Sequence, residues 1–305
     1  MTWSLFFVQA LNGLQYGVLL FLLAAGLTLV FGIMNFVNLA HGSFYMLGAY
    51  LGAAVYSASG SFVLAGVAAV TGALVIGVAI ERTTLIAFYA RDHLYQVLAT
   101  VGLILFFNET ARILWGSSAI YMRAPQAFTG AISLMGILYP SYRFLVIAVG
   151  LAVAVGLHVL IHHTRIGMLT RAGATNLRLV SVLGINIRLL NTALFGLGAA
   201  LAGLAGLMAA PILAVQPGMG DNIIVTVLLV IVVGGIGSIR GAFFGALIVG
   251  LVDTIGRVYL PILLSHLTER DSADAAGSAL ASMLIYLFMA VVLAVRPQGL
   301  FPMPR

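Results

Sequence analysis

The stretch LLFLLAAGLTLVFGIMNFVNLAHGSFYMLGAYLGAAVY, residues 19–56, decides what kind of fold this sequence can adopt. Its outer parts are apolar enough for a bilayer interior, yet four polar residues interrupt them within nine positions. These are Asn35, Asn38, His41 and Ser43. Amide and imidazole side chains compete with helical hydrogen bonding, and Gly42 weakens helix persistence further. The stretch predicts two membrane helices with a polar break at residues 34–43.

The composition extends this prediction to the whole chain. Of 305 residues, 62% are hydrophobic and 7% are charged, and the mean hydropathy is +1.16, whereas about a quarter of a soluble domain is charged. Measured against about 20 apolar residues per membrane helix, nine windows are candidate spans, with 43–58 and 222–239 short. They fall at 9–33, 43–58, 61–80, 94–115, 144–163, 189–210, 222–239, 241–260 and 279–295. Because only helices satisfy the backbone of such segments in lipid, we expect an all-α polytopic protein, one transmembrane domain over residues 1–305, with about nine (8–10) spans.

The positions of arginine predict the orientation. All 14 basic residues are arginine, and residues 162–188 hold four of them and no acid. Arginine collects in cytoplasmic loops, so we place this segment, residues 81–93, the Arg240 loop and the C-terminus in the cytoplasm. The N-terminus and the loops at 116–143, 211–221 and 261–278 are then external. The charge of +6 needs no nucleic-acid partner.

Several function classes find little support. The chain has no cysteine, which excludes disulfides and thiolate metal sites, and no lysine, which excludes a Walker A nucleotide loop. His162 and His163 lack a third ligand nearby in the sequence, so we expect no metal. Ser43, Ser238, His41 and His158 are too ordinary a set to indicate an intramembrane hydrolase. The sequence therefore predicts neither an enzyme nor a cofactor-binding protein.

Two acids lie inside predicted spans, each with an arginine on the same helix face. Glu109 precedes Arg112 by three residues, and Asp253 precedes Arg257 by four. An ionisable group within a membrane is a candidate for ion coupling. The local counter-ions favour a structural ion pair at both places, and an ion-coupled secondary transporter is the alternative.

Small residues recur at helical spacing near the C-terminus. Gly237, Gly241 and Gly245 form two overlapping GxxxG steps. Such steps allow helix backbones to approach closely in a membrane. We expect them to serve helix packing.

The cytoplasmic segment 164–188 contains ATNLRLVSVLGIN, with apolar residues on one side and Gly184 as a helix stop. It predicts a short amphipathic helix. Such a helix lies in the lipid headgroup region or docks into a groove of a partner protein. The residues alone leave both readings open.

Four segments resemble one family throughout the chain and in the same order. They are LNGLQYGVLLFLLAAGLTLVFGIMNFVNLAHGSFYMLGAY (11–50), TRIGMLTRAGATNLRLVSVLGINIRLLNTALFGLGAALAGLAGLM (164–208), VVGGIGSIRGAFFGALIVGLVD (232–253) and RPQGLFP (296–302). The sequence resembles the permease subunits of branched-chain amino acid ABC importers. The form NFVNLAHG is similar to the first of the two permease types in these systems.

The resemblance implies a type II-like importer fold, similar to the ribose- and vitamin-importing permeases, in a bacterial inner membrane. It implies a second permease (a heterodimer, with a homodimer as alternative), two cytoplasmic ATPase subunits that bind the ATP, and an external substrate-binding protein. Segment 164–188 becomes the coupling helix that docks into the ATPase. The matching positions are Arg171, Ala172, Asn176, Gly184, Ile185 and Asn186, and we count Arg178 among the coupling residues as well. The family usually has an acid where this chain has residues 176–178, so we expect a more acidic docking groove.

The resemblance also suggests a role for the polar break. We expect Asn35, Asn38, His41 and Gly42 to border the translocation path or its inner gate, because irregular backbone in a membrane is tolerated where it lines a cavity. The alternative is that these groups cap a helix and hold two spans together. The expected activity is alternating-access uptake of branched-chain or other hydrophobic amino acids. Urea, short amides and small organic acids are the alternative cargoes within the family.

Overall fold

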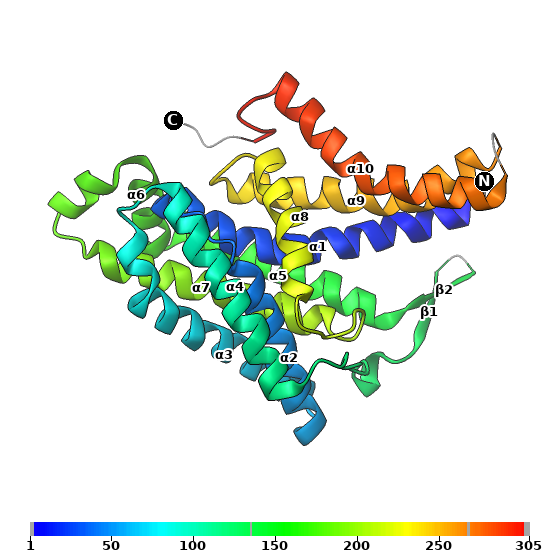
Figure 1. Ribbon diagram of the computed structural model, residues 1–305, viewed down its shortest axis with the longest axis horizontal. Coiled ribbons are helices and arrows are strands. Elements are labelled where there is room, and N and C mark those ends of the chain that lie inside the picture. Colours follow the sequence, from blue (N-terminus) through cyan, green and yellow to red (C-terminus); the bar gives the residue numbers. More distant parts are fainter. Residues whose placement is uncertain (1–2, 135, 267–268, 302–305) are drawn as a thin grey trace.

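The computed structural model describes residues 3–134, 136–266 and 269–301, and it is built almost entirely of helices (Figure 1). In the described chain the α-helices are α1 (Trp3–Met34), α2 (His41–Ser59), α3 (Phe62–Thr83), α4 (His93–Trp115), α5 (Ser141–His163), α6 (Arg165–Val182), α7 (Ile187–Ala209), α8 (Met219–Gly234), α9 (Ile239–Leu264) and α10 (Arg270–Val295). Two short 3-10 helices, η1 (Leu85–Phe88) and η2 (Gln126–Phe128), lie in the connections. The all-α expectation is confirmed.

Each of the nine apolar windows coincides with one helix, and α6 is the additional helix that the cytoplasmic segment predicted. Seven helices of the described chain are long and apolar enough to cross a membrane: α1, α3, α4, α5, α7, α9 and α10. The other two, α2 and α8, correspond to the windows that the sequence marked as short. α8 has 16 residues, about 24 Å of helix, and the hydrocarbon core is about 30 Å thick.

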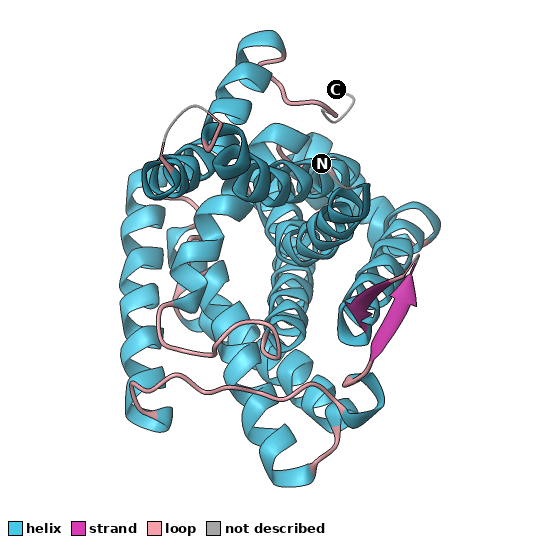
Figure 2. Cartoon of the chain, turned by 90° about the vertical axis from the view of Figure 1, so that its right-hand side faces the viewer, coloured by secondary structure: helices cyan, strands magenta, loops and turns pink. Residues whose placement is uncertain are grey.

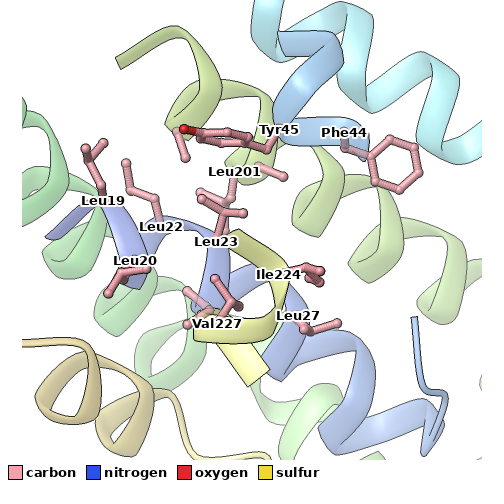
Figure 3. Close-up of a cluster of buried hydrophobic side chains, with 14 of the residues drawn as sticks. Leu19, Leu20, Leu22, Leu23, Leu27, Phe44, Tyr45, Leu201, Ile224 and Val227 are labelled. Atoms are coloured by element: carbon pink, nitrogen blue, oxygen red, sulfur yellow. The ribbon is translucent and has the colours of Figure 1, made fainter. Parts of the chain in front are cut away.

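Two helices form the centre of the bundle. In the most apolar part of α1, 89% of the residues are buried, and in α7 83%, whereas the other five long helices have 17–28%. α1 packs most extensively against α9 and then α7. Figure 3 shows the core between them, where Leu23 and Leu27 of α1 meet Leu201 of α7 and Val227 of α8. The outer helices therefore expose the apolar surface that lipid covers.

A small hairpin is the main departure from an all-helical chain. β1 (Ala131–Leu134) pairs antiparallel with β2 (Ile137–Pro140), within the loop 116–143, for which the sequence predicted no strand. The hairpin lies at the edge of the bundle (Figure 2). The hydroxyl of Tyr139 donates to Asn12 Oδ1 at 3.1 Å, which joins the hairpin to α1.

The hairpin and α6 lie at opposite ends of the long axis of the molecule (Figure 1). At the α6 end, the end of α5, the turn before α9 and Phe301 line one cavity, and Met34 meets segment 89–93 in another. These are the segments that the arginine distribution groups on one side. The start of α1 lies with the hairpin at the opposite end (Figure 1).

Candidate functional site

The polar break lies between α1 and α2, at residues 35–40. Asn35 has a φ of 48°, a left-handed conformation in which asparagine is over-represented. α2 then begins at His41, and no side chain caps its first turn. The helix is interrupted where the sequence predicted, but the polar side chains do not act as its N-terminal cap.

α2 begins well inside the bundle. A Cβ atom built on Gly26 of α1 would lie 3.0 Å from Cε1 of His41, and Gly26 precedes the end of α1 by eight residues, about 12 Å of helix. Gly42 touches the first turn of α8, because a Cβ atom there would lie 2.3 Å from the carbonyl oxygen of Gly220. The first turns of α2 and α8 therefore meet backbone to backbone within the protein.

Two side chains at the break are enclosed and carry polar atoms without a hydrogen-bond partner. Asn38 and His41 are each 1% exposed. Within the described part of the chain, neither side-chain amide atom of Asn38 nor Nε2 of His41 has a hydrogen-bond partner. An unpaired buried polar group costs about 1–3 kcal/mol. Groups that carry this cost are expected to gain partners in another state of the protein or from a passing ligand.

Asn35 lines a different space, a cavity of about 360 Å³ that it shares with residues 89–93 and Gln96. Gln96 is 3% exposed and was not predicted. The backbone amide of Val37 donates to its Oε1 at 3.2 Å, and its Nε2 donates to the carbonyl of Arg91 at 3.0 Å. Gln96 therefore attaches the break to the start of α4.

Glu81, near the end of α3, is a second buried polar residue that the sequence did not single out. Its side chain is 1% exposed. The Tyr89 hydroxyl donates to its Oε1 at 2.6 Å, and the Thr192 hydroxyl donates to its Oε2 at 2.9 Å. One carboxylate thus joins α3, the segment after η1 and α7.

α6, the predicted coupling helix, is fixed at its start to the end of α5. The Thr164 hydroxyl accepts a hydrogen bond from the backbone amide of Gly167 at 3.2 Å and so caps α6. Arg171 donates from Nη1 to the carbonyl of Ile161, one of the last carbonyls of α5. Arg171 therefore points back into the protein and braces α6.

The other end of α6 is defined by Gly184, whose φ of 83° ends the helix as the sequence predicted. Asn186 then caps α7, because its Oδ1 accepts from the amide of Leu189 at 3.1 Å. At the end of α6, Val182 and the following Leu183 are 83% and 78% exposed. An apolar surface at the end of the molecule thus precedes the central helix α7.

The remaining predicted coupling residues divide into two groups. Ala172 is exposed and Ile185 is half-buried. The side chains of Asn176 and Arg178 lie outside the described part of the structure.

The acids in the spans lie next to their arginines. Glu109 Oε1 is 2.9 Å from Arg112 Nη1, and both side chains are more than half exposed. Asp253 is buried and accepts from Arg257 Nε through both oxygens, at 3.0 and 2.9 Å. Among the described residues, no group of three or more metal-ligating side chains is placed to hold a metal ion.

The three GxxxG glycines lie at close backbone contacts, but only two of them are in a helix. A Cβ atom on Gly241 would lie 2.3 Å from the carbonyl oxygen of Gly234, and one on Gly245 would lie 2.9 Å from that of Val230. Both therefore allow the contact between α8 and α9. Gly237 lies in the turn before α9, with a φ of 81°, and is not part of that helix. A Cβ atom on Gly32 of α1 would lie 2.8 Å from its Cα atom, so Gly237 also allows a close backbone contact.

A protein-family model described as "Branched-chain amino acid transport system / permease component" matches residues 9–293. Among curated proteins, the high-affinity branched-chain amino acid transport system permease protein BraD of Pseudomonas aeruginosa is 28% identical, covering 97% of this chain and 96% of that protein. LivH of Escherichia coli, described in the same words, is also 28% identical and covers 98% and 96%. A probable LivH from Methanocaldococcus jannaschii is 28% identical over 93% and 89%.

One solved structure also resembles the chain. It is described as PsaBC from Streptococcus pneumoniae in complex with Fab, and it overlays with a TM-score of 0.46 at 12% identity, covering 93% of this chain and 94% of that one.

Proposed function

The chain belongs to the family of branched-chain amino acid transport permeases, and on this premise we propose that it is the membrane-spanning subunit of an ABC importer for branched-chain or other hydrophobic amino acids. It is a multi-pass membrane protein and not an enzyme, since a permease changes no covalent bond of its solute. A permease of this kind works with ATPase and substrate-binding subunits. In our proposal these are a second permease, two cytoplasmic ATPases and an external binding protein.

The proposed orientation places α6 in the cytoplasm. The arginine-rich segment 162–188 forms that end of the molecule, and the positive-inside rule assigns such segments to the cytoplasmic face. The hairpin end, with the start of α1, is then external. This places α6 where an ATPase subunit can reach it.

The coupling role of α6 rests on its position and its exposed end. Val182 and Leu183 offer an apolar contact for a partner groove. α6 leads through Gly184 and the cap at Asn186 directly into α7. Because α7 is packed in the centre of the bundle, and close-packed interiors transmit displacement, a push on α6 reaches the core through α7.

The gate in this proposal is the junction of α2 and α8. Discontinuous helices whose N-termini meet inside the bundle form the solute pathway in many transporters. Here the backbones of Gly42 and Gly220 close the junction, and the unpaired polar groups of Asn38 and His41 lie beside it. Separation of the two helix ends gives these groups access to water or solute. ATP binding by the partner subunits drives this change between inward- and outward-open states.

The test is solute uptake into proteoliposomes that contain the permease, its ATPases and its binding protein. Leu183→Asp is expected to lower the rate of ATP-driven uptake at least ten-fold, because it places a charge in the apolar docking surface. The matched control, Leu138→Asp, changes an equally exposed leucine (73% exposed) in the hairpin at the other end of the molecule and should leave uptake unchanged.

Two results would overturn the assignment. One is uptake by the permease alone, driven by an ion gradient and lost in Glu109→Gln or Asp253→Asn, which is the behaviour of a secondary transporter. The other is uptake by Leu183→Asp at the normal rate in a correctly assembled complex. The cargo is tested separately, by screening the partner binding protein against leucine, isoleucine, valine, urea, short amides and small organic acids.

A further inference from the structure

Two cavities meet at the end of α5, beside the start of α9. The first, which we call the arginine cavity, has a volume of about 590 Å³, lies beneath α6 and is lined by Arg171 and Arg240 among others. The second, the apolar cavity, has a volume of about 400 Å³ and lies between α5 and α9. His162 and Arg240 line both. A cationic site therefore borders an apolar one.

No acidic side chain in the described part of the chain neutralises the charge of Arg240. Its Nη2 lies 3.4 Å from Nε2 of His162. His162 Nδ1 lies 3.1 Å from the carbonyl oxygen of His158, which can only accept. Nδ1 can donate to that carbonyl while Nε2 accepts from Arg240, and an imidazole brings no negative charge to the contact. No aspartate or glutamate is among the described residues that line either cavity, and no described carboxylate pairs with Arg171 or Arg240.

The apolar cavity extends from this cation along the length of α5. Phe21 and Phe243 form its inner wall. Leu151 and Val155, on its other wall, are 41% and 64% exposed, so it reaches the outer surface of the bundle. Leu151 precedes the end of α5 by 12 residues, about 18 Å of helix. The cavity thus runs to a depth at which lipid hydrocarbon surrounds a membrane helix.

We propose that these two cavities together bind one anionic phospholipid, with the phosphate against Arg240 in the arginine cavity and an acyl chain in the apolar cavity. Basic pockets between transmembrane helices recognise such headgroups, and the uncompensated cation supplies the charge complementarity. An ATPase subunit does not reach the apolar cavity, which extends about 18 Å from the end of α5. The proposal depends on the membrane placement of α5 and α9 and not on the solute carried.

A lipid bound beneath α6 would affect the position of that helix. The arginine cavity is also lined by Thr170 and Ala174 of α6. A headgroup there contacts the helix that we propose as the coupling element, together with α1 and the turn before α9. Anionic lipid in the membrane therefore sets the position of α6.

The test uses the absence of cysteine in the chain. Val155→Cys in the full-length protein carries a single fluorophore at the apolar cavity, and the protein is reconstituted into bilayers with acyl-brominated phosphatidylglycerol or phosphatidylcholine, whose bromines quench on contact. We expect phosphatidylglycerol to quench at an about five-fold lower mole fraction, the preference that one basic side chain gives near an anionic surface. In Arg240→Gln the two lipids should quench at about the same mole fraction. In Arg240→Lys the preference for phosphatidylglycerol should persist.

The control is Arg82→Gln, which removes an exposed charge from the end of α3, close to the α6 end of the molecule, but outside both cavities. Its preference should equal that of the parent. Equal quenching by both lipids in the parent, or an equal loss in Arg82→Gln, overturns the proposal. Loss of the preference in millimolar inorganic phosphate shows a free-anion site and also overturns it. Shielding of the label from both lipids, or disulfide formation between unlabelled Val155→Cys copies, shows a protein interface there instead. Size-exclusion elution and helix content check the folding of each variant.

Discussion

Replacing Glu81 by alanine is expected to lower the free energy of unfolding by about 2–4 kcal/mol. The change leaves the half-buried Tyr89 hydroxyl without its acceptor, at a cost of about 1–3 kcal/mol, and adds a small void. Burial and, secondarily, the hydrogen bond to Glu81 raise the pKa of Tyr89, so its phenol remains a donor at neutral pH. Thr192 loses less, because its hydroxyl also lies 2.9 Å from the carbonyl of Arg188.

Glu81→Gln separates hydrogen bonding from charge. The glutamine carbonyl accepts from Tyr89, and its amide donates to the Thr192 hydroxyl, which turns its own proton to Arg188. We expect a loss of about 1 kcal/mol or less, because every hydrogen bond is retained. The measurement is unfolding in mixed detergent and SDS micelles, followed by circular dichroism, with uptake assayed on the same preparations.

A double-mutant cycle with Tyr89→Phe tests the cause. If the unpaired phenol carries the cost, Glu81→Ala combined with Tyr89→Phe should be about 1–2 kcal/mol more stable than the sum of the single changes. Glu109→Ala is the matched control, since it removes an exposed, ion-paired acid and should cost less than about 1 kcal/mol. Additive effects in the cycle, or equal losses for Glu81→Ala and Glu109→Ala, would contradict the role of Glu81 as the buried acceptor of Tyr89 and Thr192.

Three further predictions follow from the contacts described. Asn38→Leu should remove uptake while the protein keeps its stability or gains some, since an unpaired buried amide disappears. Normal uptake by this variant would exclude a gating role for Asn38, and so would loss of the folded state. Gly48→Leu should cost more than about 3 kcal/mol in SDS unfolding, because even a Cβ atom there would lie 2.3 Å from the backbone of Gly203. An SDS unfolding midpoint equal to that of the parent would contradict the close crossing of α2 and α7. Gly184→Ala should cost about 1–2 kcal/mol for its φ of 83° and Gly184→Asn less; equal losses would show that the left-handed stop is not required.

The sequence predicts the helices because membrane insertion depends on local composition. Each apolar window became a helix, and the break at residues 35–40 followed from side chains that compete with the helical backbone. The stop at Gly184 likewise needs only its own φ. These features are encoded in short stretches of the chain.

The contacts that hold the candidate site together are not encoded locally. Glu81 and Thr192 are 111 residues apart, and Gln96 and Val37 are 59 apart. Neither Glu81 nor Gln96 stands out, since each lies near the end of an apolar window. The spacing of Gly237 matches the GxxxG motif, yet α9 begins only at Ile239, so Gly237 lies in the turn before that helix. Only the tertiary arrangement identifies these residues.

The burial of α1 has a consequence for how the protein is made. α1 lies at the centre, but its most extensive neighbour, α9, starts at Ile239, 205 residues after the end of α1 at Met34. At about 5–20 residues per second, a ribosome needs about 10–40 s to synthesise that interval. Throughout it, the face of α1 that α9 will cover is open to lipid or to the insertion machinery. The centre of this permease is laid down first and is fully enclosed only when α9 has entered the bilayer.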